Sequence, residues 1–596
     1  MLQKAVDLLA KRGIDCDLGA ISWDDTAVYD LMQRGDTVGV FQLESEGMRR
    51  TLTAVKPTKF EDIIALVSLY RPGPMDNIPL FGKRKAGLEP IEYPHPKLAG
   101  ILEETYGIFV YQEQVMQAAQ ILAGYSLGDA DLLRRAMGKK VQAEMDKQRG
   151  RFVEGCKKVS DIEAQQANEL FDLIDKFAGY GFNKSHAAAY ALLAYQTAWL
   201  KAHYPEEFYA AAMCFDMDQS EKLALFVDDA RRNEIEVAPP DINRSEAEFT
   251  VERTDDGYAV RYGLAGLRNV GEKAMDAVVA EREAHGWFES LDDFFGRLPK
   301  GAMNSRQLEA LIAAGAFDRI EPNRGQLAAN VDLLLAVADA AIRERSSGQE
   351  GLFGGEDNAN EHIRMKEAED WPRGDRMAKE RETFGFYFSA HPIEGYRDVA
   401  SANGARSYAS LMEGGGPAGE GRSRAVIAAM VEGAKRGQTR RGKDFIRADF
   451  SDTSGQFSAA CFEESLVPQF TKWAEESTCI LLTVELDSPS PDEPPRITIR
   501  GARPLANVEG GKRMLLTLEV ASEAALNELA LALQPGPPGH GEVQIALDLG
   551  TGERPVMRLG HDYKVDGTLA DTLGRIEGLS NIVLVPKTGP QLHRAA

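Results

Sequence analysis

The segment 179–191, GYGFNKSHAAAYA, places two glycines and four polar side chains at the start of an apolar stretch with helical spacing. Gly179 and Gly181 permit positive φ and close backbone approach. Four donors follow where a helix would add free N–H groups and the positive end of its dipole. They are Asn183, Lys184, Ser185 and His186. This mixture suits a phosphate or nucleotide site, although it could equally be a helix start capped by Ser185.

A basic segment lies upstream of these donors. Residues 134–158 contain nine basic side chains against three acidic ones, a surplus of about +6 in a chain of net charge −23. Adjacent side chains splay apart on a helix, so Arg134 and Arg135 could hold separate phosphate oxygens. The alternative is a solvated basic helix face. The second phosphate-type element nearby favours the nucleotide site, with Arg134, Arg135, Lys139, Lys140, Asn183, Lys184, Ser185 and His186 as its candidate residues.

Five motifs occur in order along the chain: GVFQLES at 39–45, YRPGPM at 70–75, TYGIFVYQEQVM at 105–116, DLLRRAMGKK at 131–140 and the stretch 180–205. Together they resemble the fingers of the bacterial DNA polymerase III alpha subunit, polymerase family C. The resemblance continues through 263–282, 308–319, 349–353 and 380–393 and weakens after about residue 510. It implies DNA-templated nucleotidyl transfer in chromosomal replication, with primer-template DNA and an incoming deoxynucleoside triphosphate (dNTP) as ligands.

The resemblance also implies a division of labour within the family. A phosphoesterase-like domain, a palm and a thumb precede the fingers there, and three palm aspartates hold two Mg²⁺ ions. In that comparison this chain begins after the palm. We therefore expect it to hold no metal and to extend no primer by itself, because phosphoryl transfer needs carboxylates clamping metals on the reacting oxygens. Two Asp-x-Asp pairs fall at non-catalytic positions, and we assign no metal to Asp15 with Asp17 or to Asp216 with Asp218.

Protein partners are implied in the same way. The family's alpha subunit binds the sliding clamp (beta subunit), the clamp-loader tau subunit and, in the full-length protein, the proofreading exonuclease subunit. Leu352 and Phe353 are adjacent large apolar residues in the polar loop 346–360, where Gln349 could hydrogen-bond at the rim of a pocket. This QEGLF stretch resembles the family's clamp-binding peptide. Its apolar pair could instead pack on its own domain. The charge-alternating stretch 356–382 then predicts a linker anchored by Trp371.

Composition favours a large cytoplasmic protein with several domains. The 596 residues are 43% hydrophobic, enough for real cores, and contain no uninterrupted apolar run of about 18 residues. The first residues have a charged amphipathic pattern and no apolar signal core. Five scattered cysteines without a Cys-x-x-Cys pair argue for a reducing compartment and against structural zinc. The negative net charge confines any DNA contact to local basic patches.

Apolar spacing predicts a mostly α-helical fingers domain over 1–240, which ends at Pro239 and Pro240. A second domain, 241–400, opens with a short β-hairpin and continues as a tandem helix-hairpin-helix at 267–280 and 308–317. Backbone N–H groups of such hairpins face DNA phosphates. Candidate DNA-binding residues are Asn269, Val270, Gly271 and Lys273. An ordinary connection between helices is the alternative.

In residues 424–508 the spacing of apolar residues changes to that of five short strands, with one helix between the third and the fourth. This order predicts an OB-type barrel. Its first hairpin is basic and could track a single-stranded template; the candidates are Lys435, Arg436, Arg440, Arg441 and Lys443. Phe445 and Phe457 are the best stacking residues. The alternative interpretation, a purely structural barrel with a solvated basic loop, remains open.

The last segment, 511–596, predicts a small α+β domain, to which the resemblance gives clamp-loader binding but no residues. Three functions stay open. The favoured one is a C-terminal portion of the replicative polymerase; the others are a non-catalytic DNA-binding and clamp-binding scaffold and a fragment of the error-prone family C polymerase. The last is disfavoured because QEGLF and a full tail are both present.

Overall fold

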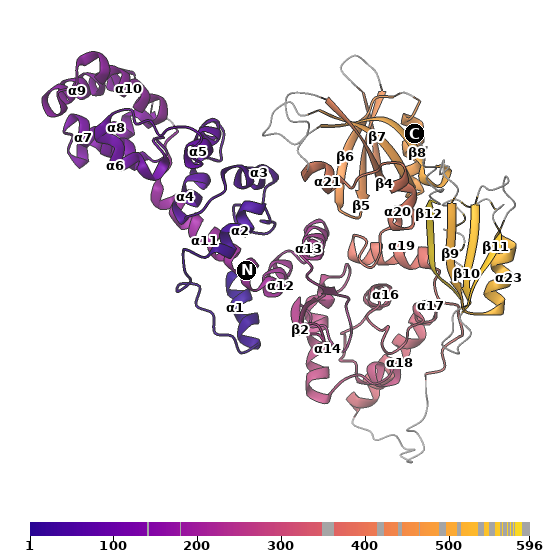
Figure 1. Cartoon of the computed structure of the whole chain (residues 1–596). Helices are drawn as coiled ribbons and strands as arrows, with labels where there is room; N and C mark the ends of the chain where they lie inside the picture. The colour runs from indigo at the N-terminus through magenta and orange to yellow at the C-terminus, as the bar shows by residue number, and fades with distance from the viewer. Residues whose placement is uncertain are drawn as a thin grey trace, which may run out of the picture. The chain divides into compact units, whose positions relative to one another are not determined.

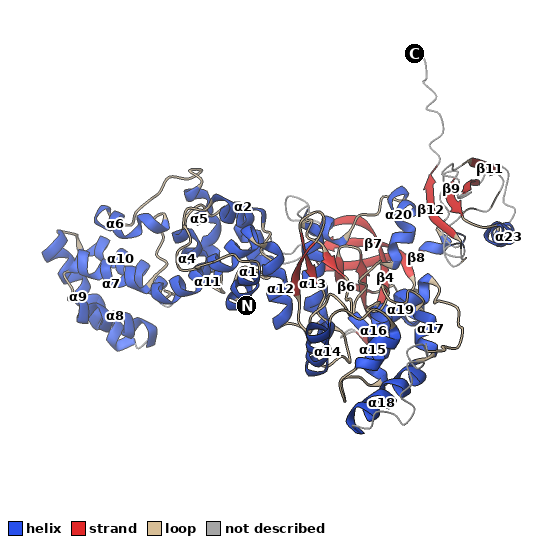
Figure 2. Cartoon of the chain, turned by 90° about the horizontal axis from the view of Figure 1, so that it is seen from below, coloured by secondary structure: helices blue, strands red, loops and turns tan. Residues whose placement is uncertain are grey.

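A computed structural model describes the chain except for residues 140, 141, 179, 348–362, 414–421, 439–443, 464, 488–495, 509–513, 534–540, 548–554, 561, 562, 564, 566–568, 570–572, 574, 575, 577 and 587–596. The chain forms two compact units, Met1–Ala212 and Met213–Ala596. Figure 1 labels their elements, and Figure 2 shows the first unit as helices and the strands gathered in the second. The multidomain layout predicted from the sequence is confirmed, while its finer boundaries stay predictions.

The first unit is helical, as predicted. Its elements are α1 (Leu2–Lys11), α2 (Thr26–Arg34), α3 (Glu46–Val55), α4 (Phe60–Leu69), α5 (Ile78–Lys85), α6 (Ala99–Leu102), α7 (Gln112–Ala123), α8 (Leu127–Lys139), α9 (Gln142–Ser160), α10 (Ala164–Ala178), α11 (Lys184–His203) and α12 (Pro205–Phe215), which runs into the second unit. In α1 the buried residues Ala5, Leu8 and Leu9 follow the spacing of one helix face. Helices α7 to α10 enclose one core, which includes Phe152 and Phe171.

The second unit opens with helix α13 (Ser220–Arg232) and a small sheet of β1 (Val237–Ala238), β2 (Thr250–Arg253) and β3 (Tyr258–Arg261) in the order β1-β3-β2. The predicted hairpin is confirmed, since β2 pairs antiparallel with β3. The helices that follow are α14 (Glu272–His285), α15 (Leu291–Arg297), α16 (Ser305–Ala314), α17 (Arg324–Ala329), α18 (Val331–Ser347), α19 (Arg373–Phe384), α20 (Arg397–Ala402) and α21 (Tyr408–Glu413).

Helix α19 corrects the linker predicted for 356–382. Its Glu380 is buried and pairs with the equally buried Arg324 at 2.9 Å. A long-range ion pair of this kind leaves no periodic apolar signal in the sequence, which explains why the helix was missed. Trp371 is half-buried, and the ammonium group of Lys379 lies 4.9 Å from its ring centroid; its role as an anchor stays a prediction, because Lys379 belongs to the same segment.

The five-stranded barrel is confirmed. Its strands are β4 (Arg422–Gln438), β5 (Asp444–Asp452), β6 (Gly455–Cys461), β7 (Cys479–Asp487) and β8 (Arg496–Pro504), closed in the order β4-β5-β6-β8-β7. Helix α22 (Val467–Glu475) lies between the third and fourth strands, as predicted. Strand β4 is not short: it spans 17 residues, and a register shift between Val431 and Gly433 lets it pair with both β5 and β7.

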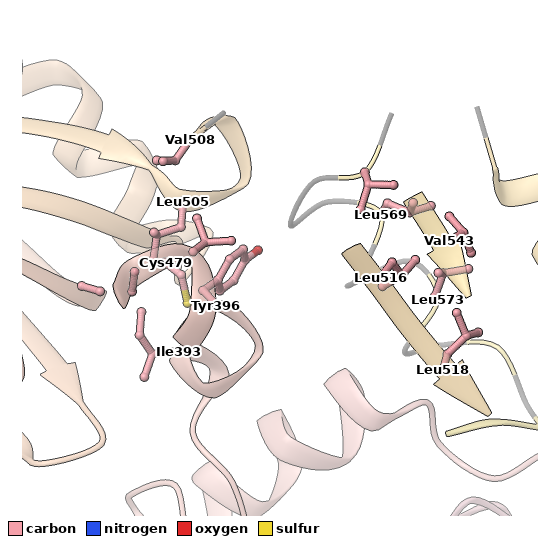
Figure 3. Packing of buried hydrophobic residues seen from close by; sticks show 14 of the residues in the cluster. Ile393, Tyr396, Cys479, Leu505, Val508, Leu516, Leu518, Val543, Leu569 and Leu573 are labelled. Atoms are coloured by element: carbon pink, nitrogen blue, oxygen red, sulfur yellow. The ribbon is translucent and has the colours of Figure 1, made fainter. Parts of the chain in front are cut away.

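The last part of the chain is an α+β arrangement. It comprises β9 (Met514–Val520), α23 (Glu523–Ala532), β10 (Gly541–Leu547), β11 (Val556–Gly560) and β12 (Leu579–Pro586), with sheet order β11-β10-β9-β12. Figure 3 shows Leu516, Leu518 and Val543 of this sheet with Leu569 and Leu573 beside them. Strand β12 was not predicted. Among the described helices, none is long and apolar enough to cross a membrane.

Candidate nucleotide and nucleic-acid sites

The structure brings together motifs that lie far apart in the sequence. Tyr111 and Phe182 form a parallel β-bridge. The backbone N–H of Gln112 donates to the carbonyl of Phe182 at 2.9 Å, and the N–H of Phe182 donates to the carbonyl of Val110 at 3.1 Å. The stretch TYGIFVYQEQVM is therefore joined to GYGFNKSH directly before helix α11.

Helix α11 begins with a side-chain cap, but the capping residue is not Ser185. Asn183 Oδ1 accepts the backbone N–H of His186 at 2.8 Å. Gly181 does not use positive φ either, because its backbone lies outside the left-handed region. A Cβ built there would stand 3.1 Å from Gln112 Cγ, so this glycine serves close approach alone. Gly179 lies outside the described residues.

A carboxylate already occupies the amino end of α11. Glu113 accepts the Asn183 side-chain amide at 2.9 Å and the backbone N–H of Lys184 at 3.0 Å. The ammonium group of Lys184 pairs with Glu104 at 2.6 Å. A negative group is favoured at this position because free N–H groups and the helix dipole point toward it. Two of the four predicted residues, Asn183 and Lys184, thus donate to Glu113, an anion that in this state belongs to the protein.

The two arginines of helix α8 also share a carboxylate. Asp131 pairs with Arg134 at 2.7 Å and with Arg135 at 2.8 Å, and hydrogen bonds from Arg134 hold the pKa of its carboxyl below the usual range. Arg134 further donates to Gln112 Oε1 at 3.1 Å, while Gln112 Nε2 donates to the carbonyl of Gly181 at 3.1 Å. Gln112 therefore links the arginine helix to the donor segment. Sequence reasoning missed this residue.

The surplus of positive charge over 134–158 is largely offset by neighbouring acids. Arg149 pairs with Asp172 at 2.6 Å and Arg151 with Asp129 at 2.6 Å, and both acids lie outside that stretch. Counting charges along the sequence overlooked partners supplied by packing. Lys140 and the side chain of Lys139 lie outside the part of the chain that the structure describes.

Arg71, of the motif YRPGPM, is a site residue that sequence reasoning quoted without assigning. Its guanidinium lies 4.6 Å from the ring centroid of Phe182 and donates to the carbonyl of Tyr180. No described carboxylate forms an ion pair with it. Arg71 thereby differs from Arg134, Arg135 and Lys184. The available signal was an arginine directly before the turn residues Pro72 and Gly73, and its Nε also donates to the carbonyl of Ser68 at 2.8 Å.

The first helix-hairpin-helix turn keeps three of its four candidates at the surface. Asn269 has φ 66°, and Gly271 is the N-cap residue of α14. Asn269, Gly271 and Lys273 are exposed, whereas Val270 is only 8% exposed. The side chain of Val270 therefore belongs to the core, and only its backbone could meet a phosphate.

In the second hairpin, the side chain of Arg324 fills the turn at Gly315. Gly315 ends helix α16 with φ 81°, and a Cβ there would stand 2.1 Å from Arg324 Nη2. Arg324 in turn pairs with Asp318 at 2.6 Å and donates to the carbonyl of Ala313 at 2.9 Å. A side chain larger than hydrogen at position 315 would collide with the buried guanidinium of Arg324, so this turn needs a glycine.

The barrel corrects one stacking candidate. Phe457 is buried, with its ring stacked on Tyr408 at 4.8 Å and on Phe450 at 5.2 Å. Phe445 instead stacks on Phe462 at 5.4 Å, and Phe462 is 48% exposed. The aromatic pair that reaches the surface is therefore Phe445, which is half-buried, with the exposed Phe462.

The basic hairpin of the barrel is described in part. Lys435 lies opposite Arg447 in the β4–β5 register, both exposed, and Arg436 pairs with Asp444. Arg440, Arg441 and Lys443 lie outside the described residues, as do Gln349, Leu352 and Phe353. The assignments on these six residues remain predictions.

A helical domain, a helix-hairpin-helix module and a closed five-stranded barrel form a combination that is typical of nucleic-acid-binding proteins. Residues 1–160 match the bacterial DNA polymerase III alpha subunit finger domain, and residues 234–327 match the helix-hairpin-helix motif. The chain belongs to the family of bacterial DNA polymerase III alpha subunits.

Several curated relatives carry the name DNA polymerase III subunit alpha. The protein of Caulobacter vibrioides is 42% identical over 585 residues, which cover 97% of this chain and 50% of the relative. That of Thermus aquaticus is 44% identical over 480 residues, 78% of this chain and 38% of the relative. That of Escherichia coli O6:H1 is 38% identical over 577 residues, 94% and 49% respectively. The chain spans about half the length of the curated relatives it matches.

Proposed function

We propose that this chain supplies the fingers, DNA-binding and clamp-binding portion of a replicative DNA polymerase, whose reaction is DNA-templated nucleotidyl transfer. One observation carries the proposal. Residues from YRPGPM, TYGIFVYQEQVM, DLLRRAMGKK and GYGFNKSH meet around Gln112 and Phe182, next to the amino end of helix α11. Three cationic side chains lie there: Arg71, Arg134 and Lys184.

The incoming triphosphate is the anion that this arrangement would take. Arg135 and Lys184 would exchange their carboxylate partners for phosphate oxygens, and charge-assisted bonds of this kind are the strong ones. Arg71 would reach the phosphates without giving up a described carboxylate partner. His186, exposed on the first turn of α11, would lie near the sugar or the base.

Magnesium belongs to the reaction that the family implies. Within the described ranges, no group of three or more His, Cys, Asp or Glu side chains could hold a metal ion. In the family resemblance Mg²⁺ is held by palm aspartates, and we propose no role toward it for the arginines and lysines named above. The role proposed for them is to bind and orient the nucleotide and the DNA.

The other ligands follow from the later parts of the chain. Asn269, Gly271 and Lys273 would contact the phosphates of a duplex, and Lys435 with the Phe445–Phe462 pair would hold a single strand. The peptide at 349–353 would bind the sliding clamp, and the C-terminal sheet would bind the clamp loader.

Two assays on the purified chain test the proposal together. In a fluorescence-anisotropy titration, the chain should bind labelled primer-template DNA. In a second titration of the same kind, it should bind a labelled dNTP. In a primer-extension assay with Mg²⁺ and all four nucleotides, we expect no extended product. Failure to bind DNA or nucleotide would contradict the binding role, and extension by a preparation free of other polymerases would contradict the predicted inactivity.

A further inference from the structure

Helix α19 is attached to the helix-hairpin-helix module near both of its turns. Its Glu380 pairs at 2.9 Å with Arg324, the residue that fills the second hairpin. Close to the first hairpin turn, the N–H of Arg268 donates to the carbonyl of Thr383 at 2.9 Å. These contacts tie α19 to the module, so a group that α19 holds takes its position from the module.

The residue after Glu380 contacts the barrel. Arg381 pairs with Glu432 of strand β4, and the two side chains are 33% and 13% exposed. Glu432 is the extra residue of a β-bulge, because the β4–β5 register shifts between Val431 and Gly433. A bulge turns a side chain away from the direction that a regular strand would give it. An irregularity of the barrel therefore places Glu432 against the module.

Two further side chains extend this contact. The hydroxyl of Ser451, on β5, donates to Glu432 Oε1, and His391 Nε2 lies 2.9 Å from Ser451 Oγ. Burial, together with the charge of Arg381, lowers the pKa of His391 to about 4, so the ring is neutral near pH 7. Its Nδ1 accepts the N–H of Ile393 at 3.2 Å, which leaves the proton on Nε2 to be donated to Ser451. Arg381, Glu432, Ser451 and His391 thus form one continuous polar network.

A cavity of about 100 Å³ lies beside this network. Residues of α13, of the segment after α19 and of strands β4 to β6 line it, among them Asp228 and Asp452. Burial raises the pKa of both carboxyls. The cavity is polar and large enough for water. Polar interfaces between domains of one chain resemble transient interfaces, so this part of the joint can open.

Apolar contacts join the same two parts of the chain. Tyr387, which follows α19, donates its hydroxyl to Met430 Sδ at 3.4 Å. Ile393 and Tyr396 share one buried cluster with Met430 and Cys479 of the barrel, and Figure 3 shows them beside Cys479. Apolar burial is non-directional, whereas charge-assisted hydrogen bonds impose a geometry. The apolar contacts therefore keep the barrel against the module, and the polar network selects one orientation.

We propose that Arg381, Glu432, Ser451 and His391 form a latch that fixes the orientation of the barrel on the helix-hairpin-helix module. When the latch is broken, the apolar contacts alone remain, and the barrel can tilt and uncover Cys479. This role concerns the joint between the two parts, so it holds whether or not the chain binds nucleic acid.

Thiol alkylation tests the latch on the full chain with its native cysteines. Cys479 is 9% exposed at the joint, and Cys461 is fully buried inside the barrel. The chain is exposed to iodoacetamide, and the labelling of each cysteine is followed by mass spectrometry. Arg381→Met and Glu432→Gln should each raise the alkylation rate of Cys479 at least about tenfold, the shift in an opening equilibrium expected when a hydrogen bond to a charged group is lost. The rate at Cys461 should stay at that of the parent.

Two matched variants remove ion pairs that do not cross the joint. Arg376→Met breaks a pair with Asp370 on the module side, and Asp444→Asn breaks a pair with Arg436 within the barrel. Neither variant should change the rate at Cys479.

Two more variants test whether the residues act together. The double variant of Arg381→Met with Glu432→Gln should react no faster than either single variant, because both substitutions remove the same contact. Ser451→Ala keeps the ion pair and should raise the rate at Cys479 by a smaller factor. Because this substitution removes one hydroxyl, it also tests the latch if the charge variants fold poorly.

The contrary outcomes are distinct. An unchanged rate at Cys479 in both single variants would show that the apolar contacts fix the orientation, and would overturn the latch. Equal increases at Cys479 and Cys461 would assign the ion pair to the stability of the barrel itself and overturn the latch as well. A double variant that reacts much faster than either single variant would show that Arg381 and Glu432 act separately. An unchanged rate in Ser451→Ala would remove Ser451 and His391 from the latch.

Discussion

The carboxylate of Glu113 accepts the backbone N–H of Lys184 at 3.0 Å, at the amino end of helix α11. Lys184 belongs to the segment that predicts a phosphate site, and Glu113 comes from a motif about 70 residues earlier. An anion therefore lies where the sequence predicts one. Because the same donors can bind either a carboxylate or a phosphate, we expect Glu113 to compete for them with the phosphate of the proposed nucleotide.

Substitution of Glu113 by Gln tests this competition. The charge at the helix terminus is lost, so we expect the stability of the first unit to fall by about 1 kcal/mol. Affinity for a deoxynucleoside triphosphate should rise, because a neutral amide competes less well for the N–H groups. Calorimetric titration and thermal unfolding measure the two effects. Glu46→Gln, in the first turn of α3, is the matched control and should leave nucleotide affinity unchanged. Weaker nucleotide binding by Glu113→Gln would show that this carboxylate supports the site.

The two adjacent arginines should behave differently. Arg135 is 63% exposed and pairs with Asp131, whereas Arg134 also holds Gln112. In an enzyme completed by its catalytic part, Arg135→Ala should lower catalytic efficiency about tenfold to a hundredfold, the loss expected for one charge-assisted contact. Primer-template affinity should stay nearly the same. Arg134→Ala should lower both nucleotide use and thermal stability.

Steady-state kinetics and DNA titrations on both variants decide this prediction. If Arg135→Ala weakens DNA binding alone, helix α8 contacts the duplex and the assignment to the triphosphate is wrong.

Helices and strands with regular apolar spacing could be predicted from the sequence because that spacing is a local signal. Apolar residues at helical spacing predicted the fingers, and alternating strands around one helix predicted the barrel, which closes as expected. The length of β4 and the strand β12 were missed. Helix α19 was missed because its polar sequence is held by the buried pair of Glu380 with Arg324, a contact that only tertiary packing creates.

The donors of the candidate site were predicted and their partners were not. Lysine and arginine can be recognised as candidate phosphate-binding residues from their type alone. Their carboxylate partners could not be recognised, because Glu104 and Glu113 are remote in sequence from Lys184. Asp131 is an exception. It precedes Arg134 by three residues and Arg135 by four, a spacing that predicts ion pairs on a helix, so this partner was available from the sequence.

A half-buried carboxyl in the second unit, that of Asp228, gives a pH prediction. Burial raises the pKa of Asp228 to about 6, against the opposing effect of Arg231 and Arg232. Below pH 4 both the folded and the unfolded protein hold the proton. Between about pH 4 and 6 the unfolded chain is ionised while the folded protein still holds the proton, so the contribution of Asp228 to stability falls over this range, and above pH 6 the folded protein carries a poorly solvated charge.

Asp228→Asn should therefore raise the melting temperature at pH 7, and the gain should vanish as the pH approaches 4. Thermal unfolding between pH 4 and 7.5 measures it. Glu221→Gln, exposed on the same helix, is the control and should change the melting temperature little. A variant that is less stable than the parent at pH 7 would show that the Asp228 carboxylate is used by its arginine neighbours.

The apolar pair in the clamp-type peptide yields a binding prediction. Changing Leu352 and Phe353 together to alanine should weaken clamp binding by at least about 2 kcal/mol, the scale of hot-spot residues. Gln349→Ala should weaken it less, since a rim contact contributes less than a buried anchor. Calorimetry with the purified clamp measures both, and unchanged affinity in the double variant would remove this peptide from the interface.

His186 is the residue through which the fingers should sense the sugar of the nucleotide. Its ring is exposed and lies against that of Tyr190, with centroids 4.5 Å apart and ring planes tilted by 36°. In the completed enzyme, His186→Ala should change the discrimination between deoxyribose and ribose more than the affinity for the triphosphate, because the substitution removes bulk and leaves Arg135 and Lys184 in place. His186→Phe keeps the stacked ring and should preserve discrimination. Kinetics with matched deoxyribonucleotides and ribonucleotides measure the ratio. An equal loss with both sugars would place His186 at the phosphates.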